Sequence, residues 1–113
     1  VYCVDYFPDD IYERMFDDVA KEFKNIVKIK DRSENAHKAF SDFYFDLIYI
    51  DAMHDYLDVM QDIENWKPKV KKGGFLAGHD YNSLNSEGVM RAVNEVFGKP
   101  DKVYEDSSWI KQL

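Results

Sequence analysis

This 113-residue sequence lacks paired cysteines, long apolar runs and an excess of positive charge. Its only cysteine is Cys3, which excludes an internal disulfide framework and favours a reducing compartment, so we expect a cytoplasmic protein. No apolar run approaches the roughly 18 residues that span a bilayer, so we expect no membrane partner. Lys and Arg total 15 against 22 Asp and Glu, a net charge of -7, which repels phosphate backbones and argues against nucleic acid.

Several catalytic and nucleotide-binding motifs are also missing. The sequence has no Gly-x-Ser-x-Gly, which argues against an esterase-type nucleophile. It has neither Gly-x-Gly-x-x-Gly nor a P-loop. No linker rich in Pro, Gly or Ser and no internal repeat divides the chain, so we predict a single domain over residues 1–113.

Apolar runs and amphipathic stretches alternate along most of the chain. We expect strands at 1–4, 26–29, 45–50 and 75–78, helices at 10–24, 33–40, 55–66 and from about 87 to 97, a turn at 71–74, and a closing hairpin of 103–104 with 109–110. Such alternation predicts an α/β fold with a mostly parallel sheet, a C-terminal antiparallel hairpin and helices on both faces, in three layers.

The first helix has a recognisable start. Asp10 followed three residues later by Glu13 resembles a capping box, with Asp in place of Ser or Thr. Apolar residues then recur at helical spacing, which predicts an amphipathic helix. They are Ile11, Met15, Val19 and Phe23.

Polar residues follow the expected strands where ligands bind in parallel sheets. They are Asp5, Asp31, Asp51 and the pair His79-Asp80. If the strands before Asp51 and His79 are neighbours, Asp51 and Asp80 converge on one rim. Two carboxylates and an imidazole from His54 or His79 could hold a divalent cation, Mg²⁺ or Ca²⁺ on oxygen alone and Mn²⁺, Fe²⁺ or Zn²⁺ with histidine.

Each of these residues also has a purely structural interpretation. Asp5 could accept hydrogen bonds from ribose hydroxyls, or it could be an ordinary turn acid. Asp51 and Asp80 could cap the helices that follow them, with the two histidines simply solvated. The spacing alone leaves both interpretations open.

Three segments together resemble the later half of class I S-adenosylmethionine-dependent methyltransferases. They are FDLIYIDAMHDY at 45–56, DIENW at 62–66 and KGGFLAGHDY at 72–81. The nearest group is the small-molecule O-methyltransferase-like family. This resemblance implies a Rossmann-like methyltransferase sheet, S-adenosylmethionine as cofactor and a small molecule as methyl acceptor.

The resemblance also implies roles for individual residues. Asp5 falls on the acid that binds the cofactor's ribose, and the residues after the next strand lie near the adenine. The implied cofactor-binding set is Asp5, Asp31, Arg32, Ser33 and Asp51. Metal-dependent relatives hold Mg²⁺ at positions that correspond to Asp51, His79 and Asp80.

Two residues depart from that pattern. His79 stands where relatives carry an acid, and Met53 stands where some relatives carry another. His54 or His79 could therefore act as the catalytic base and take a proton from a substrate hydroxyl, since imidazole titrates near neutrality.

The family's first strand and Gly-rich loop precede the ribose acid, whereas only four residues precede Asp5. The sequence is therefore expected to be a fragment that lacks this first strand and binds cofactor weakly. The resulting gap would be repaired by pairing of strand 1–5 with strand 45–50, or covered by a second copy of the chain in a homo-oligomer. A longer parent protein is the third expectation.

Two other functions compete with the methyltransferase interpretation. In a phospho-receiver domain, Asp51 would be the phosphoacceptor at the end of its strand. The receiver's Met-Pro turn is replaced by Met53-His54, however, and the Ser or Thr at the next strand end is replaced by His79-Asp80. The other alternative is a non-catalytic remnant of the methyltransferase fold.

Overall fold

The computed structural model describes residues 1–82, 84 and 87–113. The chain divides into two compact units, Val1–Ala39 and Phe40–Leu113, which are described separately below. A single domain over the whole chain stays a prediction. No helix within the described ranges is both long and apolar enough to cross a bilayer.

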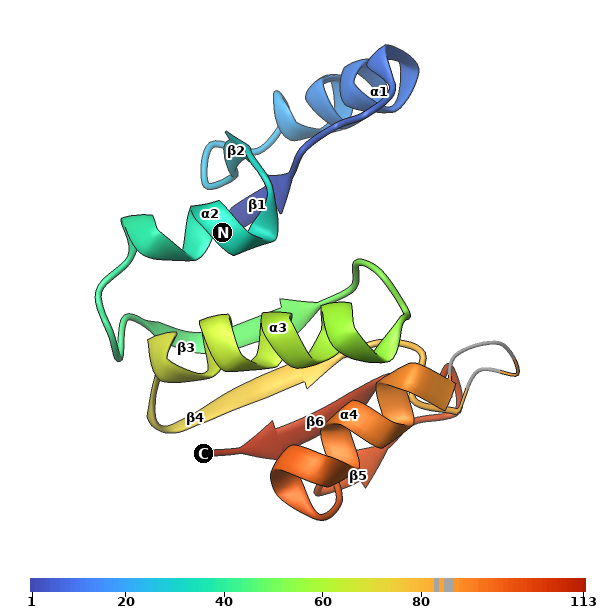
Figure 1. The fold of residues 1–113 in the computed structure, drawn as a ribbon. Helices are drawn as coiled ribbons and strands as arrows, with labels where there is room; N and C mark the ends of the chain where they lie inside the picture. Colours follow the sequence, from blue (N-terminus) through green and yellow to red (C-terminus); the bar gives the residue numbers. More distant parts are fainter. Residues whose placement is uncertain (83, 85–86) are drawn as a thin grey trace. The chain divides into compact units, whose positions relative to one another are not determined.

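The Val1–Ala39 unit is built on one parallel pair of strands (Figure 1). Its elements, in order, are β1 (Tyr2–Asp5), α1 (Asp10–Ala20), β2 (Val27–Lys30), α2 (Ser33–Ala36) and the 3-10 turn η1 (His37–Ala39). Cys3 pairs with Lys28 at the centre of the ladder. Because α1 connects two parallel neighbours, the predicted strand–helix–strand crossover is confirmed in this unit.

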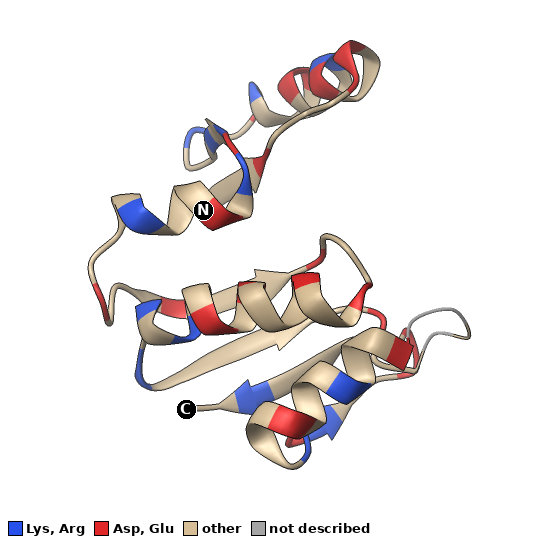
Figure 2. Cartoon of the chain, viewed as in Figure 1, with Lys and Arg blue, Asp and Glu red and all other residues tan. Residues whose placement is uncertain are grey.

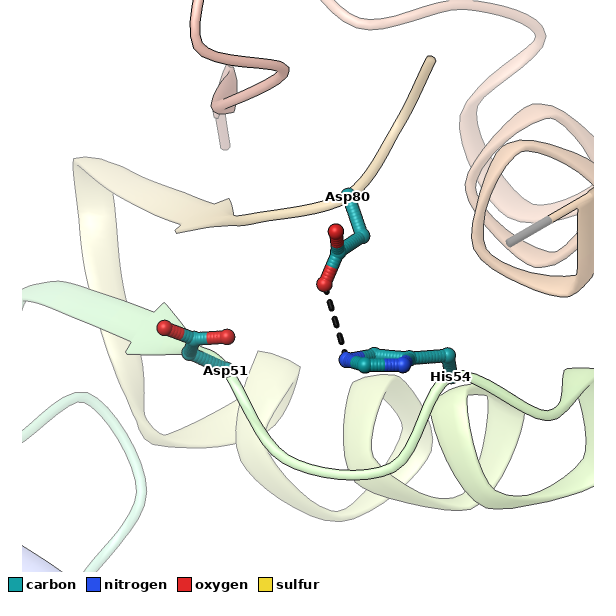
Figure 3. A group of neighbouring side chains, drawn as sticks. All are labelled: Asp51, His54 and Asp80. Carbon is teal, nitrogen blue, oxygen red and sulfur yellow. Dashed lines mark ion pairs between the residues drawn. The ribbon is translucent and has the colours of Figure 1, made fainter. Parts of the chain in front are cut away.

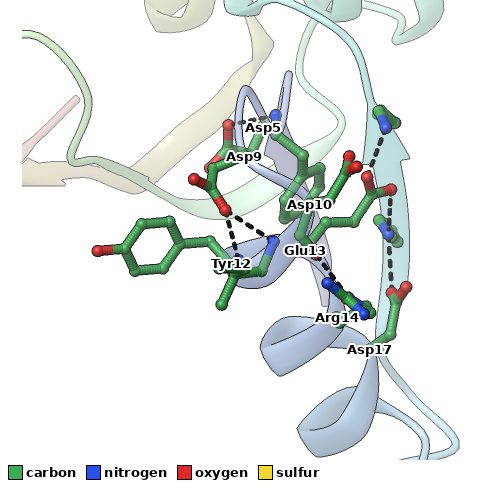
Figure 4. Close-up of polar contacts among 11 residues, drawn as sticks. Asp5, Asp9, Asp10, Tyr12, Glu13, Arg14 and Asp17 are labelled. Atoms are coloured by element: carbon green, nitrogen blue, oxygen red, sulfur yellow. Dashed lines mark hydrogen bonds and ion pairs between the residues drawn. The ribbon is translucent and has the colours of Figure 1, made fainter.

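Helix α1 begins at Asp10 as expected and ends at Ala20, before the expected end at 24, and its N-cap differs from the one that the sequence suggested. Asp9, in an extended conformation, is its N-cap, and Asp9 Oδ1 accepts from the backbone N–H groups of Ile11 at 2.7 Å and Tyr12 at 3.4 Å (Figure 4). The predicted capping box at Asp10 is therefore wrong. The Glu13 carboxylate is unavailable for it because it binds the ammonium groups of Lys28 and Lys30 on β2.

The Phe40–Leu113 unit contains a four-stranded mixed sheet in the order β3-β4-β6-β5. Its elements are β3 (Phe45–Ile50), α3 (Tyr56–Trp66), η2 (Lys67–Lys69), β4 (Val70–Gly78), α4 (Glu87–Phe97), β5 (Lys102–Val103) and β6 (Trp109–Gln112). Strands β3 and β4 are parallel, whereas β6 is antiparallel to both β4 and β5, which confirms the predicted closing hairpin. Strands β1 and β3 are assigned to separate sheets, and the three ways in which the gap could be repaired or explained stay predictions.

Helices α3 and α4 supply one side of the core of this unit, and the sheet supplies the other (Figure 1). The fully buried side chains come from both layers and include Ile63 of α3, Val93 of α4, Leu76 of β4 and Trp109 of β6. Burial of large apolar side chains is the main term that stabilises this sheet–helix arrangement.

Strand β4 is longer than expected. The predicted turn at 71–74 is wrong, because this segment lies within β4. The register against β3 shifts there, from Phe45 opposite Val70 to Leu47 opposite Phe75. The extra residues leave the β3 ladder but remain bonded to the end of the chain, where Gly73 N–H donates to the Leu113 carbonyl at 2.7 Å.

Candidate functional site

The loops after β3 and β4 bring three polar side chains together at the carboxyl end of the sheet (Figure 3). Asp51 directly follows β3, His54 lies in the same loop just before α3, and Asp80 is the second residue after β4. One ligand atom from each residue lies within 4.8 Å of the other two. The predicted convergence of Asp51 and Asp80 on one rim is confirmed by this distance.

His54 and Asp80 form the closest pair in this group. His54 Nε2 lies 2.8 Å from Asp80 Oδ2. The Asp80 side chain is 15% exposed and that of His54 is 52% exposed, so an acid shielded from water meets an accessible imidazole. Asp80 also has a φ of 63°, a left-handed conformation that costs a non-glycine residue about 1 kcal/mol or more.

His79 lies near the other carboxylate oxygen of Asp80 and outside the three-residue group. Its Nδ1 is 3.4 Å from Asp80 Oδ1. His79 also faces Asp106, whose pKa is held below its usual range, mainly by the Ser108 backbone N–H at 3.0 Å and to a lesser degree by the charge of His79. The sequence-predicted metal set of Asp51, His79 and Asp80 is thus only partly assembled, and His54 occupies the place expected for His79.

The start of α3 carries a polar pair that sequence reasoning missed. The Tyr56 hydroxyl donates to Glu95 of α4 at 2.8 Å, and this hydrogen bond raises the pKa of Tyr56. The Arg91 guanidinium carbon lies 4.1 Å from the centre of the Tyr56 ring. The partners are 39 residues apart in sequence, so no local motif could have revealed them.

The predicted ribose and adenine residues lie in the other unit, at the ends of β1 and β2. Asp5 is exposed, and its Oδ1 accepts from the Phe7 backbone N–H at 2.9 Å. Its second carboxylate oxygen makes no hydrogen bond to any described residue, so it is available to a ligand hydroxyl. Asp31 follows β2, and its backbone N–H donates to the Asp5 carbonyl at 3.1 Å, which keeps the two strand ends together.

Arg32 and Ser33 continue from Asp31. The Arg32 N–H donates to Asp31 Oδ1 at 2.7 Å, and its guanidinium carbon lies 5.1 Å from the ring centre of Tyr6, the residue after Asp5. Ser33 begins α2. The structure therefore gathers Asp5, Asp31 and Arg32 in one unit, whereas Asp51 belongs to the other.

Charge is unevenly distributed over the Phe40–Leu113 unit (Figure 2). Acidic residues collect around the loops after β3 and β4, where Asp51 and Asp80 lie. Lysines collect at the opposite end, where η2 leads into β4. The candidate site is therefore on the acidic end of this unit, which suits a cation or a neutral polar ligand better than an anion.

Solved structures with the same fold were found at low sequence identity. CalS11, a TDP-rhamnose 3'-O-methyltransferase of calicheamicin biosynthesis, matches with a TM-score of 0.73 and 12% identity over 98% of this chain and 56% of its own. A Corynebacterium glutamicum protein matches at 0.70 and 12%, over 96% and 58%. A Sulfolobus solfataricus protein assigned to the type 11 methyltransferases matches at 0.63 and 18%, over 98% and 69%.

These matches establish the predicted α/β, Rossmann-like fold, and the chain spans little more than half the length of the first two structures. No curated protein sequence matches the chain. The family model described as a methyltransferase domain matches residues 1–81, which include Asp5, Asp51, His54 and Asp80. This match favours the methyltransferase interpretation over the phospho-receiver one. The chain belongs to the methyltransferase domain family.

Proposed function

We propose that this protein transfers a methyl group from S-adenosylmethionine to a hydroxyl group of a small molecule in the cytoplasm. Family membership supports the reaction class. The observation that carries the hydroxyl acceptor is the His54–Asp80 pair, an imidazole 2.8 Å from a largely buried carboxylate at the ligand-binding end of the sheet. Such a pair is suited to remove a proton from a hydroxyl group.

The residues at the ends of β1 and β2 fit the cofactor. The exposed carboxylate of Asp5 would accept a ribose hydroxyl, with Asp31, Arg32 and Ser33 beside the adenine. When bound, S-adenosylmethionine supplies a methyl group attached to a positively charged sulfur. The residues after β3 and β4 would then remove the proton from the acceptor hydroxyl.

His54 is proposed as the catalytic base. With Nε2–H donating to Asp80, Nδ1 is left to accept the proton of the acceptor hydroxyl. With its proton on His54, the acceptor oxygen would be the nucleophile for the methyl group that bound S-adenosylmethionine would supply. His79 is the second candidate base, since Asp80 also faces its Nδ1 at 3.4 Å.

A divalent cation is a second proposed component of the site. Asp51, His54 and Asp80 provide two carboxylates and one imidazole at a spacing that one ion could bridge. A ligand set of this kind accepts Mn²⁺, Fe²⁺ or Zn²⁺ as well as Mg²⁺. The ion would stabilise negative charge on the acceptor oxygen, and His79 would then be the free imidazole.

Binding of S-adenosylhomocysteine tests the cofactor site. Calorimetry on the 113-residue chain is expected to show weak binding that Asp5→Ala abolishes, because the ribose acid is lost. Asp18→Ala, an exposed acid on α1, is the matched control and should leave the affinity unchanged. Absence of binding in the wild type would favour the non-catalytic alternative, and nanomolar binding would show that the cofactor site is misplaced.

Titration with Mn²⁺ tests the metal site separately. Asp51→Asn and Asp80→Asn should each weaken binding by about tenfold or more. Asp106→Asn, a rim acid outside the group, should not change it. Equal affinity in all four proteins would exclude a cation at this position. A homo-oligomer stays a prediction, which sedimentation of the same samples would test.

A further inference from the structure

Gly88, the second residue of α4, lies against the backbone of the loop that carries His54. A Cβ atom built at Gly88 would lie 2.5 Å from the His54 carbonyl oxygen, 2.6 Å from the Tyr56 nitrogen and 3.0 Å from the Asp55 carbonyl carbon. All three are backbone atoms of one short segment, 54–56. They cannot move aside by a side-chain rotation, so any larger residue must displace the segment itself.

The glycine is not explained by backbone conformation. Positive φ values occur among the described glycines only at Gly73 and Gly98, so Gly88 has an ordinary conformation that any residue adopts. Within a helix, glycine costs about 1 kcal/mol relative to alanine. Alanine at position 88 would therefore be unfavourable because its Cβ atom would clash with segment 54–56.

Helix α4 cannot move away from segment 54–56 to accommodate a larger residue at position 88. Val89, the next residue, is 3% exposed and belongs to the same buried cluster as Val59 of α3 and Trp109 of β6. These packed side chains hold the first turn of α4 in place. The segment 54–56 is mostly exposed and is the part that would yield.

We infer that Gly88 is a positioning residue: by letting α4 touch segment 54–56, it places the His54 imidazole against Asp80. The inference rests on the proposed function only for the role of this pair in catalysis. The placement itself is a property of the folded chain without cofactor, metal or acceptor.

The test measures whether the His54 ring and the Asp80 carboxylate remain in contact. In the wild-type background, Asp80→Asn should shift the NMR signals of the His54 ring, because their contact is 2.8 Å. In a Gly88→Ala background the same substitution should shift them by less than half as much. Val96→Ala, which also loosens α4 packing but lies two turns from the loop, should leave the full shift in place.

A full Asp80→Asn shift in the Gly88→Ala background would overturn the inference. If Gly88→Ala does not fold, the same comparison is made in the presence of trimethylamine N-oxide, which favours the compact state. Loss of more than half of the Asp80→Asn shift under these conditions supports the inference, and a full shift contradicts it. Because no ligand is present, failure of methyl transfer would not affect the result.

Discussion

The carboxylate of Asp80 reaches His54 Nε2 at 2.8 Å from a left-handed backbone, with φ of 63° at Asp80. This contact is therefore made at a position where an ordinary side chain is unfavourable. The left-handed conformation of Asp80 lowers the stability of the fold at the point where β4 ends and the candidate site begins.

Comparison of two substitutions at this position isolates the backbone effect. Asp80→Gly and Asp80→Ala both remove the carboxylate, but only glycine tolerates the left-handed conformation without a Cβ clash. Asp80→Gly should be more stable than Asp80→Ala by about 1 kcal/mol in urea unfolding. At Asp106, where φ is not positive, glycine should be no more stable than alanine. If the glycine variant were more stable than the alanine variant at both positions, a strained backbone at Asp80 would be contradicted.

The core of the Phe40–Leu113 unit should depend strongly on Ile63. This side chain is fully buried between α3 and the sheet, so Ile63→Ala should lower the free energy of unfolding by about 2–5 kcal/mol. Leu57→Ala on the same helix is the control, because Leu57 is 75% exposed and its loss should have little effect. Similar losses from both variants would refute the core assignment.

Helix α1 should be more sensitive to Asp9 than to Asp10. Asp9→Ala removes the side chain that accepts two backbone N–H groups, at a cost of about 1 kcal/mol to the helix. Asp10→Ala removes no capping contact and should leave the helical signal in circular dichroism nearly unchanged. A larger loss of helical signal from Asp10→Ala than from Asp9→Ala would support the capping box that the sequence suggested.

The contacts of Glu13 should make stability depend on pH. The hydrogen bonds from Lys28 and Lys30 lower the pKa of Glu13 below its usual value, so its contribution is complete above the unfolded-state pKa of about 4.3 and is lost as pH falls through the folded value. Glu13→Gln should therefore lower the urea midpoint at pH 7.

At pH 3 the wild type and Glu13→Gln should converge. Glu22→Gln, an exposed acid without an ion pair among the described residues, should match the wild type at both values. A gap that is constant between pH 7 and pH 3 would exclude the proposed contribution of the Glu13 carboxylate.

Strand and helix positions were largely predictable because each depends on local pattern. The apolar run Phe45–Ile50 and the periodic stripe from Val89 to Phe97 needed no partner to be recognised. The convergence of Asp51 and Asp80 also followed, since neighbouring parallel strands place their carboxyl ends together.

Contacts between distant segments were not predictable in the same way. The resemblance to a known family implied His79 as the metal ligand, and only the fold shows that His54 joins Asp51 and Asp80. Gly73 and Gly74 indicated a turn, because nothing local shows that Leu113 hydrogen-bonds to this segment and keeps it in β4. The contact of Gly88 with segment 54–56 has no sequence signal at all.

Strand β6 pairs with the end of β4, which leads into the candidate site, and β6 is translated after β4. Gly78 pairs with Trp109, so the end of β4 is held by a strand made about thirty residues later, and Trp109 itself is 1% exposed. A ribosome completes Asp51, His54 and Asp80 well before it makes that strand. Until then the nascent sheet has an open edge on β4 that other chains could bind. The residues of the site are thus translated before the strand that pairs with the end of β4.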